Sequence, residues 1–139
     1  MLRLWFYLWV LPVTLLGMLA GLVARSSGGS VQRVEGVLEV SGGWPARVLR
    51  HGFPFSGAVV AITLGHVVLG VSDGALAATR AHERAHVRQF ERWGVLLLVL
   101  YPLAGLLAWL RGGHPYWDNR FEREARAAES AAWGQSIGR

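Results

Sequence analysis

The 139-residue sequence contains no cysteine, and all 14 of its basic residues are arginine because lysine is absent. Without cysteine there are no disulfides and no thiolate ligands, so any metal ion has to be held by histidine, aspartate or glutamate. The net charge is +5, but the arginines are scattered and charged residues make up only 17% of the chain. A nucleic-acid-binding surface is therefore not expected.

Charge is missing altogether from residues 4–24, which are flanked by Arg3 and Arg25. This stretch is long enough to span a bilayer, and its early aromatic cluster is typical of a membrane interface. A cleaved signal peptide is the alternative, but the charged leader is short and no clear cleavage site follows. We expect a transmembrane anchor over 1–25, a flexible linker over 26–30, and one domain over 31–139. Arginines after the anchor favour the cytoplasmic side of the cell membrane for this domain.

The remaining sequence predicts an α+β domain. Valine-rich residues 31–40 indicate a strand, and residues 58–71 indicate a β-hairpin or one long strand kinked at Gly65. Residues 46–55 have no regular pattern. Asp73 is a possible helix cap before good helix formers over 75–93, and Gly94 stands where a C-terminal glycine belongs. Alanine-rich residues 119–133 predict a final helix, with Asn119 as its N-cap.

The first of these helices carries the motif H-E-x-x-H, from His82 to His86. Two histidines four positions apart on a helix point the same way, so both imidazoles can bind one metal ion. Glu83 then lies beside the metal, where it can take a proton from a metal-bound water as a general base. A charged, solvated helix face is the alternative interpretation of this stretch. A zinc hydrolase also needs a third protein ligand.

Several downstream side chains can supply that ligand: His114, Asp118, Glu122, Glu124 and Glu129. Glu122 begins the pattern E-x-x-A on the final helix. H-E-x-x-H followed by such a glutamate resembles the gluzincin metallopeptidases, and the short chain is similar to the minigluzincins. The apolar segment between the motifs is similar to membrane peptidases related to the CAAX prenyl proteases, although Arg126 stands where their pattern continues with aspartate.

This resemblance implies that His82, His86 and Glu122 bind Zn²⁺ and that Glu83 is the general base. Glu124 is the alternative third ligand, but it lies about 200° further round the helix, so both glutamates cannot face one metal.

Other polar residues near the third ligand are candidates for supporting roles. His114 and Tyr116 are available to stabilise the oxyanion of peptide hydrolysis. Asp118 or Asn119 can orient a zinc-bound histidine through a hydrogen bond. His51 and His66 lie beside glycines at turns, and we expect them to be structural or solvent-facing.

The apolar segment 95–110 lies between the two motifs and contains Pro102. A single bilayer crossing here would put the zinc ligands on opposite sides of the membrane. We therefore expect a re-entrant or interfacial segment, with a buried core helix as the alternative. The predicted function is a membrane-anchored zinc metallopeptidase acting on a peptide or protein substrate. A non-catalytic metal-binding or interaction module at the membrane is the other hypothesis.

Overall fold

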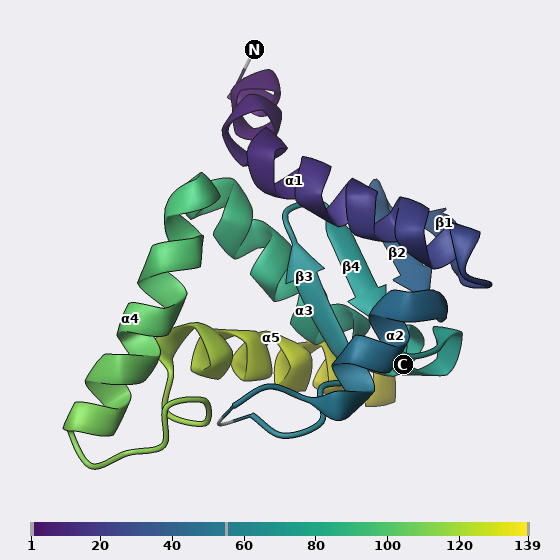
Figure 1. Cartoon of the computed structure of the whole chain (residues 1–139). Coiled ribbons are helices and arrows are strands. Elements are labelled where there is room, and N and C mark those ends of the chain that lie inside the picture. Colours follow the sequence, from purple (N-terminus) through teal and green to yellow (C-terminus); the bar gives the residue numbers. More distant parts are fainter. Residues whose placement is uncertain (1, 55, 139) are drawn as a thin grey trace.

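A four-stranded sheet lies at the centre of the computed structural model, which describes residues 2–54 and 56–138 (Figure 1). The strands lie in the order β1-β2-β4-β3, and only the β2–β4 pair is parallel. The α+β class predicted from the sequence is confirmed. The strands are β1 (Ser30–Val34), β2 (Val37–Ser41), β3 (Ala61–Leu64) and β4 (Val67–Gly70).

Helices cover both faces of this sheet (Figure 1). On one face lie α1 (Leu2–Ser26) and α2 (Gly43–His51), and on the other lies α3 (Asp73–Trp93). Side chains of β4 alternate between the layers: Val67 packs below α1, and Val68 packs with Leu76 of α3. A short 3-10 turn, η1 (Gly94–Leu96), leads into α4 (Leu97–Leu110), and α5 (Arg120–Ile137) packs against α3.

The valine-rich segment corrects one prediction, because residues 31–40 form two antiparallel strands rather than one. The turn consists of Glu35 and Gly36, both with positive φ (51° and 83°). Two such residues make the tight turn whose twist suits a hairpin. Glycine adopts this conformation readily but glutamate rarely does, so Glu35-Gly36 gave little indication of a turn in the sequence.

Residues 46–55 correct a second prediction, since α2 continues from Gly43 to His51. Pro45 does not interrupt this helix, because it lies in the first helical turn, where its missing N–H costs nothing. Ala46 and Leu49 are buried against the sheet, and Gly52 ends the helix with φ 78°.

The other predicted elements are present. Residues 61–70 form the expected hairpin, turning at Gly65 with φ 64°. The N-cap of α3 is Ser72, whose hydroxyl accepts a hydrogen bond from the Ala75 N–H, whereas Asp73 accepts one from Ser41 of β2. Asn119 caps α5 as expected, its side chain accepting from the Phe121 N–H.

The long apolar helix α1 has two different faces along its second half. Gly17 and Ala24 lie against the sheet, where a Cβ at Gly17 would come within 2.6 Å of the Val67 Cβ. The opposite face exposes large apolar side chains: Leu15, Leu16, Met18, Leu19, Leu22 and Val23. The predicted linker is a tight turn, in which the Gly29 N–H donates to the Ala24 carbonyl. The helix predicted as an anchor is thus also one layer of the fold.

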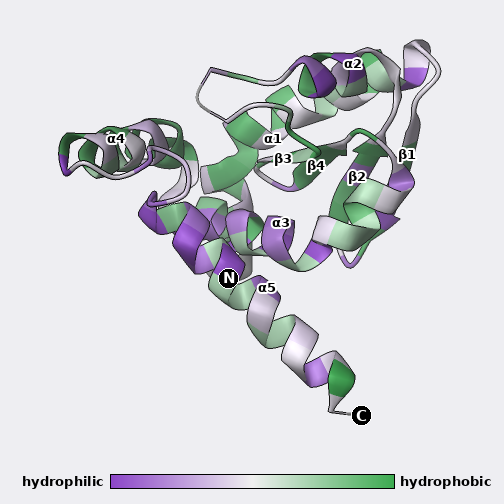
Figure 2. Ribbon diagram, turned by 90° about the horizontal axis from the view of Figure 1, so that it is seen from below, coloured by the Kyte–Doolittle hydropathy of each residue, from purple (hydrophilic) through white to green (hydrophobic). Residues whose placement is uncertain are grey.

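The second apolar helix, α4, lies to one side of the sheet and is hydrophobic along its length (Figure 2). Among the described residues, two helical stretches are long and apolar enough to cross a membrane: residues 4–26, and the continuous run 73–110 that ends with α4. After α4 the chain returns, and α5 packs beside α3. The two motif-bearing helices are therefore neighbours.

Candidate metal centre

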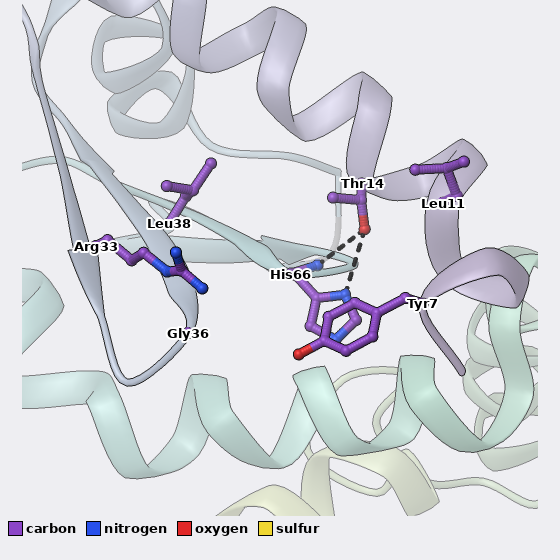
Figure 3. Close-up of a pocket in the computed structure, with 7 residues that line it drawn as sticks. All are labelled: Tyr7, Leu11, Thr14, Arg33, Gly36, Leu38 and His66. Carbon is purple, nitrogen blue, oxygen red and sulfur yellow. Dashed lines mark hydrogen bonds between the residues drawn. The ribbon is translucent and has the colours of Figure 1, made fainter. Parts of the chain in front are cut away.

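A small pocket of about 260 Å³ lies between α1 and the β1–β2 hairpin, and His66 lines it (Figure 3). The imidazole stacks on the Tyr7 ring at 4.8 Å, and its Nε2 lies 3.0 Å from a Glu91 carboxylate oxygen. The backbone N–H of His66 donates to the Thr14 hydroxyl. These contacts tie the β3–β4 turn to α1 and α3, so of the two roles expected for His66, structural or solvent-facing, it has the structural one.

A larger cleft of about 750 Å³ opens between β3 and α4, and both histidines of the H-E-x-x-H motif line it. The loop after α2 and the segment leading into α5 complete its walls. β3 is the last strand of the sheet, so the edge that faces this cleft has no strand partner among the described residues.

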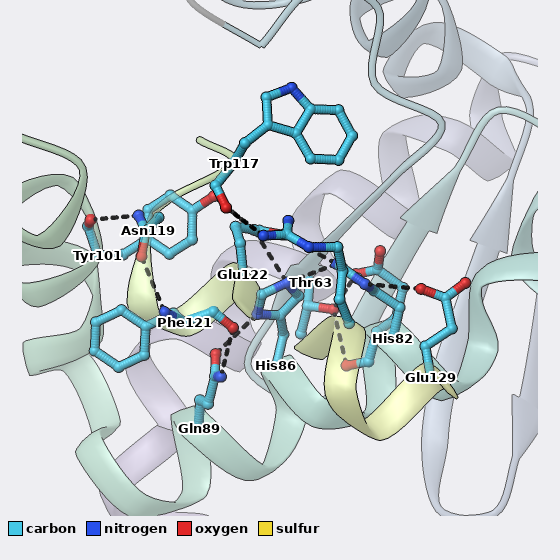
Figure 4. Close-up of polar contacts among 12 residues, drawn as sticks. Thr63, His82, His86, Gln89, Tyr101, Trp117, Asn119, Phe121, Glu122 and Glu129 are labelled. Atoms are coloured by element: carbon cyan, nitrogen blue, oxygen red, sulfur yellow. Dashed lines mark hydrogen bonds and ion pairs between the residues drawn. The ribbon is translucent and has the colours of Figure 1, made fainter. Parts of the chain in front are cut away.

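Three side chains converge in the cleft from two helices (Figure 4). The Nε2 atoms of His82 and His86 lie 3.2 Å apart, and each is within 3.2 Å of an oxygen of Glu122. All the ligand atoms lie within 4.8 Å of one another, so these residues, the His-His-Glu cluster, can hold a metal ion. Glu124 is exposed and lies outside the cluster.

Local features of α5 position Glu122. The Asn119 cap fixes the start of the helix, and Phe121 is buried in the core with Phe90 of α3. One turn further on, Ala125 is fully buried. A small side chain at this position lets α5 approach α3 closely enough for the carboxylate to reach both imidazoles. The small residue of the E-x-x-A pattern thus has a packing reason.

Gln89, one turn after His86, sets the tautomer of that histidine. Its amide nitrogen donates to the Phe121 carbonyl at 3.0 Å, so its amide oxygen, 2.8 Å from His86 Nδ1, has to accept. The proton of His86 is therefore on Nδ1, which leaves the Nε2 lone pair directed at the cluster. Gln89 is only 2% exposed.

His82 has a weaker partner of the same kind. Its Nδ1 lies 3.4 Å from a carboxylate oxygen of Glu129, one of the five candidates for third ligand. Glu129 is about half exposed, with 46% of its side chain accessible. Because Nδ1 faces Glu129, the Nε2 atom of His82 is free to face the cluster.

Charge is shared unevenly within the cluster. Burial lowers the pKa of His82 and His86, but the hydrogen bond and charge of Glu122 together with the charge of Glu83 outweigh it, so each pKa lies above its ordinary value. Burial likewise raises the pKa of Glu122, yet hydrogen bonds from both imidazoles hold it well below the usual range. A proton and a metal ion therefore compete for the same imidazole nitrogens.

Glu83 lies on the neighbouring face of α3 and is only 6% exposed. Its carboxylate accepts a hydrogen bond of 2.7 Å from the hydroxyl of Thr63 on β3. Burial raises the pKa of Glu83, while the two histidines and Thr63 act in the opposite direction. A carboxylate whose pKa is raised toward neutrality is suited to exchanging protons.

Two tyrosines face the cluster. The Tyr101 hydroxyl on α4 donates to a Glu122 oxygen at 2.6 Å, and Tyr116 lines the cleft beside it. His114 is exposed, and its Nδ1 accepts from the backbone N–H groups of Tyr116 and Trp117. Of the two residues predicted to stabilise an oxyanion, only Tyr116 reaches the cleft.

The residues predicted to orient a histidine are used elsewhere, which corrects that prediction. Asp118 accepts from the His114 N–H. Asn119 caps α5 through its oxygen and donates to the Tyr101 carbonyl through its nitrogen. Their place is taken by Gln89 and Glu129. The sequence held one clue to Gln89, an amide three positions after His86 on the same helical face.

No protein-family model, curated protein or solved structure matches this chain. The resemblance to gluzincins consequently stays a prediction that rests on the two motifs, and the cluster geometry is independent of it.

Proposed function

We propose that this chain is a membrane-associated zinc metallopeptidase. The observation that carries the proposal is the convergence of His82, His86 and Glu122 on one point, beside Glu83 and the open edge of β3. Two imidazoles and a carboxylate suit zinc and leave a fourth position for water. When bound, zinc polarises a peptide carbonyl and lowers the pKa of its water to about 7.

Residues of the chain would bind the substrate, transfer the proton and stabilise the oxyanion. A substrate peptide pairs with the free edge of β3, which positions a scissile carbonyl over the cluster. Glu83, oriented by Thr63, takes a proton from the water as its oxygen attacks the carbonyl carbon. The same carboxyl group then gives this proton to the amine nitrogen as the C–N bond breaks. Tyr116 lines the cleft and is the candidate donor to the developing oxyanion, whereas the Tyr101 hydroxyl donates to Glu122.

The apolar helices support a location at the membrane. α1 and α4 expose uncharged faces of leucine, valine and tryptophan, and the stretches 4–26 and 73–110, which include them, are by length and composition apolar enough to cross a bilayer. Arg25 in the last turn of α1, and the arginines at 33, 47 and 50 after it, favour the cytoplasmic side for the metal centre.

Elemental analysis of detergent-purified protein tests the metal site. We expect about one zinc per chain in the wild type and in Glu124→Ala, and a loss of zinc in Glu122→Ala. No zinc in the wild type, even after metal is supplied, would refute the proposal.

Glu83→Gln separates an enzyme from a metal-binding module, because only catalysis needs the base. With a library of quenched fluorescent peptides as substrate, the variant should keep its zinc and lose roughly 100- to 10,000-fold in activity. Zinc binding without any hydrolysis by the wild type would leave the non-catalytic module as the better description.

A further inference from the structure

The cleft above the His-His-Glu cluster is continuous with the outer surface of α4. Four large apolar residues line the cleft and are also between 42% and 61% exposed: Phe53, Leu98, Leu106 and Trp109. An apolar path formed by these residues therefore runs from the metal site to the surface.

Apart from the His-His-Glu cluster and Glu83, the lining of the cleft is almost free of charged side chains. Its described lining residues include the cluster and Glu83 but no arginine and no aspartate. The chain has 14 arginines, so their absence from this surface is notable. A charged substrate side chain would lose its hydration here and gain no partner, which is unfavourable. The lining instead suits leucine-like and aromatic side chains.

The cleft opens onto the outer surface of α4, which is apolar and has to be shielded from water. Residues 95–110 contain no charge, and among them Val99, Leu103, Leu107 and Leu110 are 47–65% exposed. Soluble monomers rarely expose contiguous apolar patches of more than a few hundred Å². Trp109 and Arg111 close the segment, as residues at a membrane–water boundary do. The chemistry of this face fits the acyl region of a bilayer.

We propose that the cleft opens toward the lipid and receives an uncharged, apolar peptide segment from the bilayer side. This inference rests on the proposed peptidase function and adds the substrate class and its route of entry. The substrate backbone lies along β3, and its side chains contact Leu98, Leu106 and Trp109 of α4.

Spin labelling tests the route of entry without any need for metal. Because the chain lacks cysteine, a single introduced cysteine carries the only label. In nanodiscs, a label at Leu106→Cys should be more accessible to oxygen, which concentrates in lipid, than to a water-soluble nickel chelate. A label at Arg47→Cys, on the exposed surface of α2, should show the opposite order. If the labels at both sites are more accessible to the nickel chelate than to oxygen, the proposal is wrong.

Two peptide hydroxamates of equal length, one with leucine and one with glutamate side chains, test the substrate class. The zinc-loaded wild type should bind the leucine probe roughly tenfold or more tightly, since burying one leucine is worth that much. Leu106→Gln should weaken binding of the leucine probe roughly fivefold. Leu103→Gln, equally exposed but outside the cleft, should not (47% against 48%).

The outcomes of the two experiments separate the hypotheses. Equal affinity for both probes, or equal effects of the two glutamine variants, would refute apolar selection while leaving the peptidase intact. A protein without zinc would refute the proposed function, and the spin-label result would still decide whether the cleft opens to lipid.

Discussion

Replacing Gln89 with leucine tests whether the metal site depends on residues beyond its three ligands. The substitution preserves size but removes the acceptor for the His86 Nδ1 proton and the donor to the Phe121 carbonyl. Both groups are then left unpaired in a buried setting, and His86 becomes free to change tautomer or rotate. An Nδ1 proton that moves to Nε2 blocks the atom facing the cluster.

The size of the effect follows from these two hydrogen bonds. Loss of a residue that orients a metal-bound histidine typically lowers metal affinity about 10- to 100-fold, or about 1.4–2.7 kcal/mol. Zinc affinity measured by competition with a chromophoric chelator should fall by this factor in Gln89→Leu. Folding stability should fall as well, because each unpaired buried group costs about 1–3 kcal/mol.

The matched control is Gln135→Leu, the same substitution at an exposed site on α5. It should leave both zinc affinity and melting temperature unchanged. If Gln89→Leu lowers the melting temperature but binds zinc as tightly as the wild type, Gln89 has only a packing role and the tautomer argument is wrong.

Three further predictions concern packing, the general base and pH. Gly17→Ala should destabilise the protein by about 1–3 kcal/mol in chemical unfolding, because its Cβ would lie 2.6 Å from Val67, whereas Gly134→Ala, with no neighbour within 4 Å, should stabilise it by about 0.5–1 kcal/mol. If Gly17→Ala unfolds with the same free energy as the wild type, α1 does not pack on the sheet. Thr63→Val removes a hydrogen bond that lowers the pKa of Glu83, so the acidic limb of the pH profile of kcat/KM should move to higher pH; an unmoved limb would separate Glu83 from the base. Metal-free protein should melt highest between about pH 4.5 and 6.5. The pKa of Glu122 is lower in the folded protein, so its stabilisation is fully present above pH 4.5 and is lost as the pH falls through the folded-state pKa. The pKa of each histidine is higher in the folded protein, so its stabilisation is fully present below pH 6.5 and is lost as the pH rises through the folded-state pKa. Saturating zinc should abolish the alkaline decline.

The parts of the site that sequence could predict are local. The spacing of His82 and His86 places both on one side of any α-helix, whatever surrounds it. Asn119 before an alanine-rich run is a capping signal that needs no tertiary information. The helix over 75–93 and the hairpin around Gly65 were likewise predictable from local residues, although the helix cap is Ser72 and not the predicted Asp73.

The parts that sequence left open depend on contacts between distant segments. Tyr101 reaches Glu122 only because α4 turns back toward α5, and no periodicity within 95–110 distinguishes this tyrosine. Likewise, the partner of Gln89 is a backbone carbonyl on another helix. In a uniformly apolar helix such as α1, the sequence also does not indicate which face is buried. Hydropathy does not reveal that Gly17 and Ala24 turn toward the sheet while Leu16 and Leu19 turn away.

The position of the cluster has a consequence for chain stability. His82 and Glu122 are 40 residues apart in the sequence, and α4 lies between them. An ion that binds both ends ties off this loop as a covalent cross-link does. In the loop-entropy treatment of disulfides, closing a loop of this length is worth about 4 kcal/mol. In a sequence without cysteine, zinc would thus supply a cross-link that no disulfide can, and it would add to the packing of Phe121 and Ala125 that already holds α5 on α3.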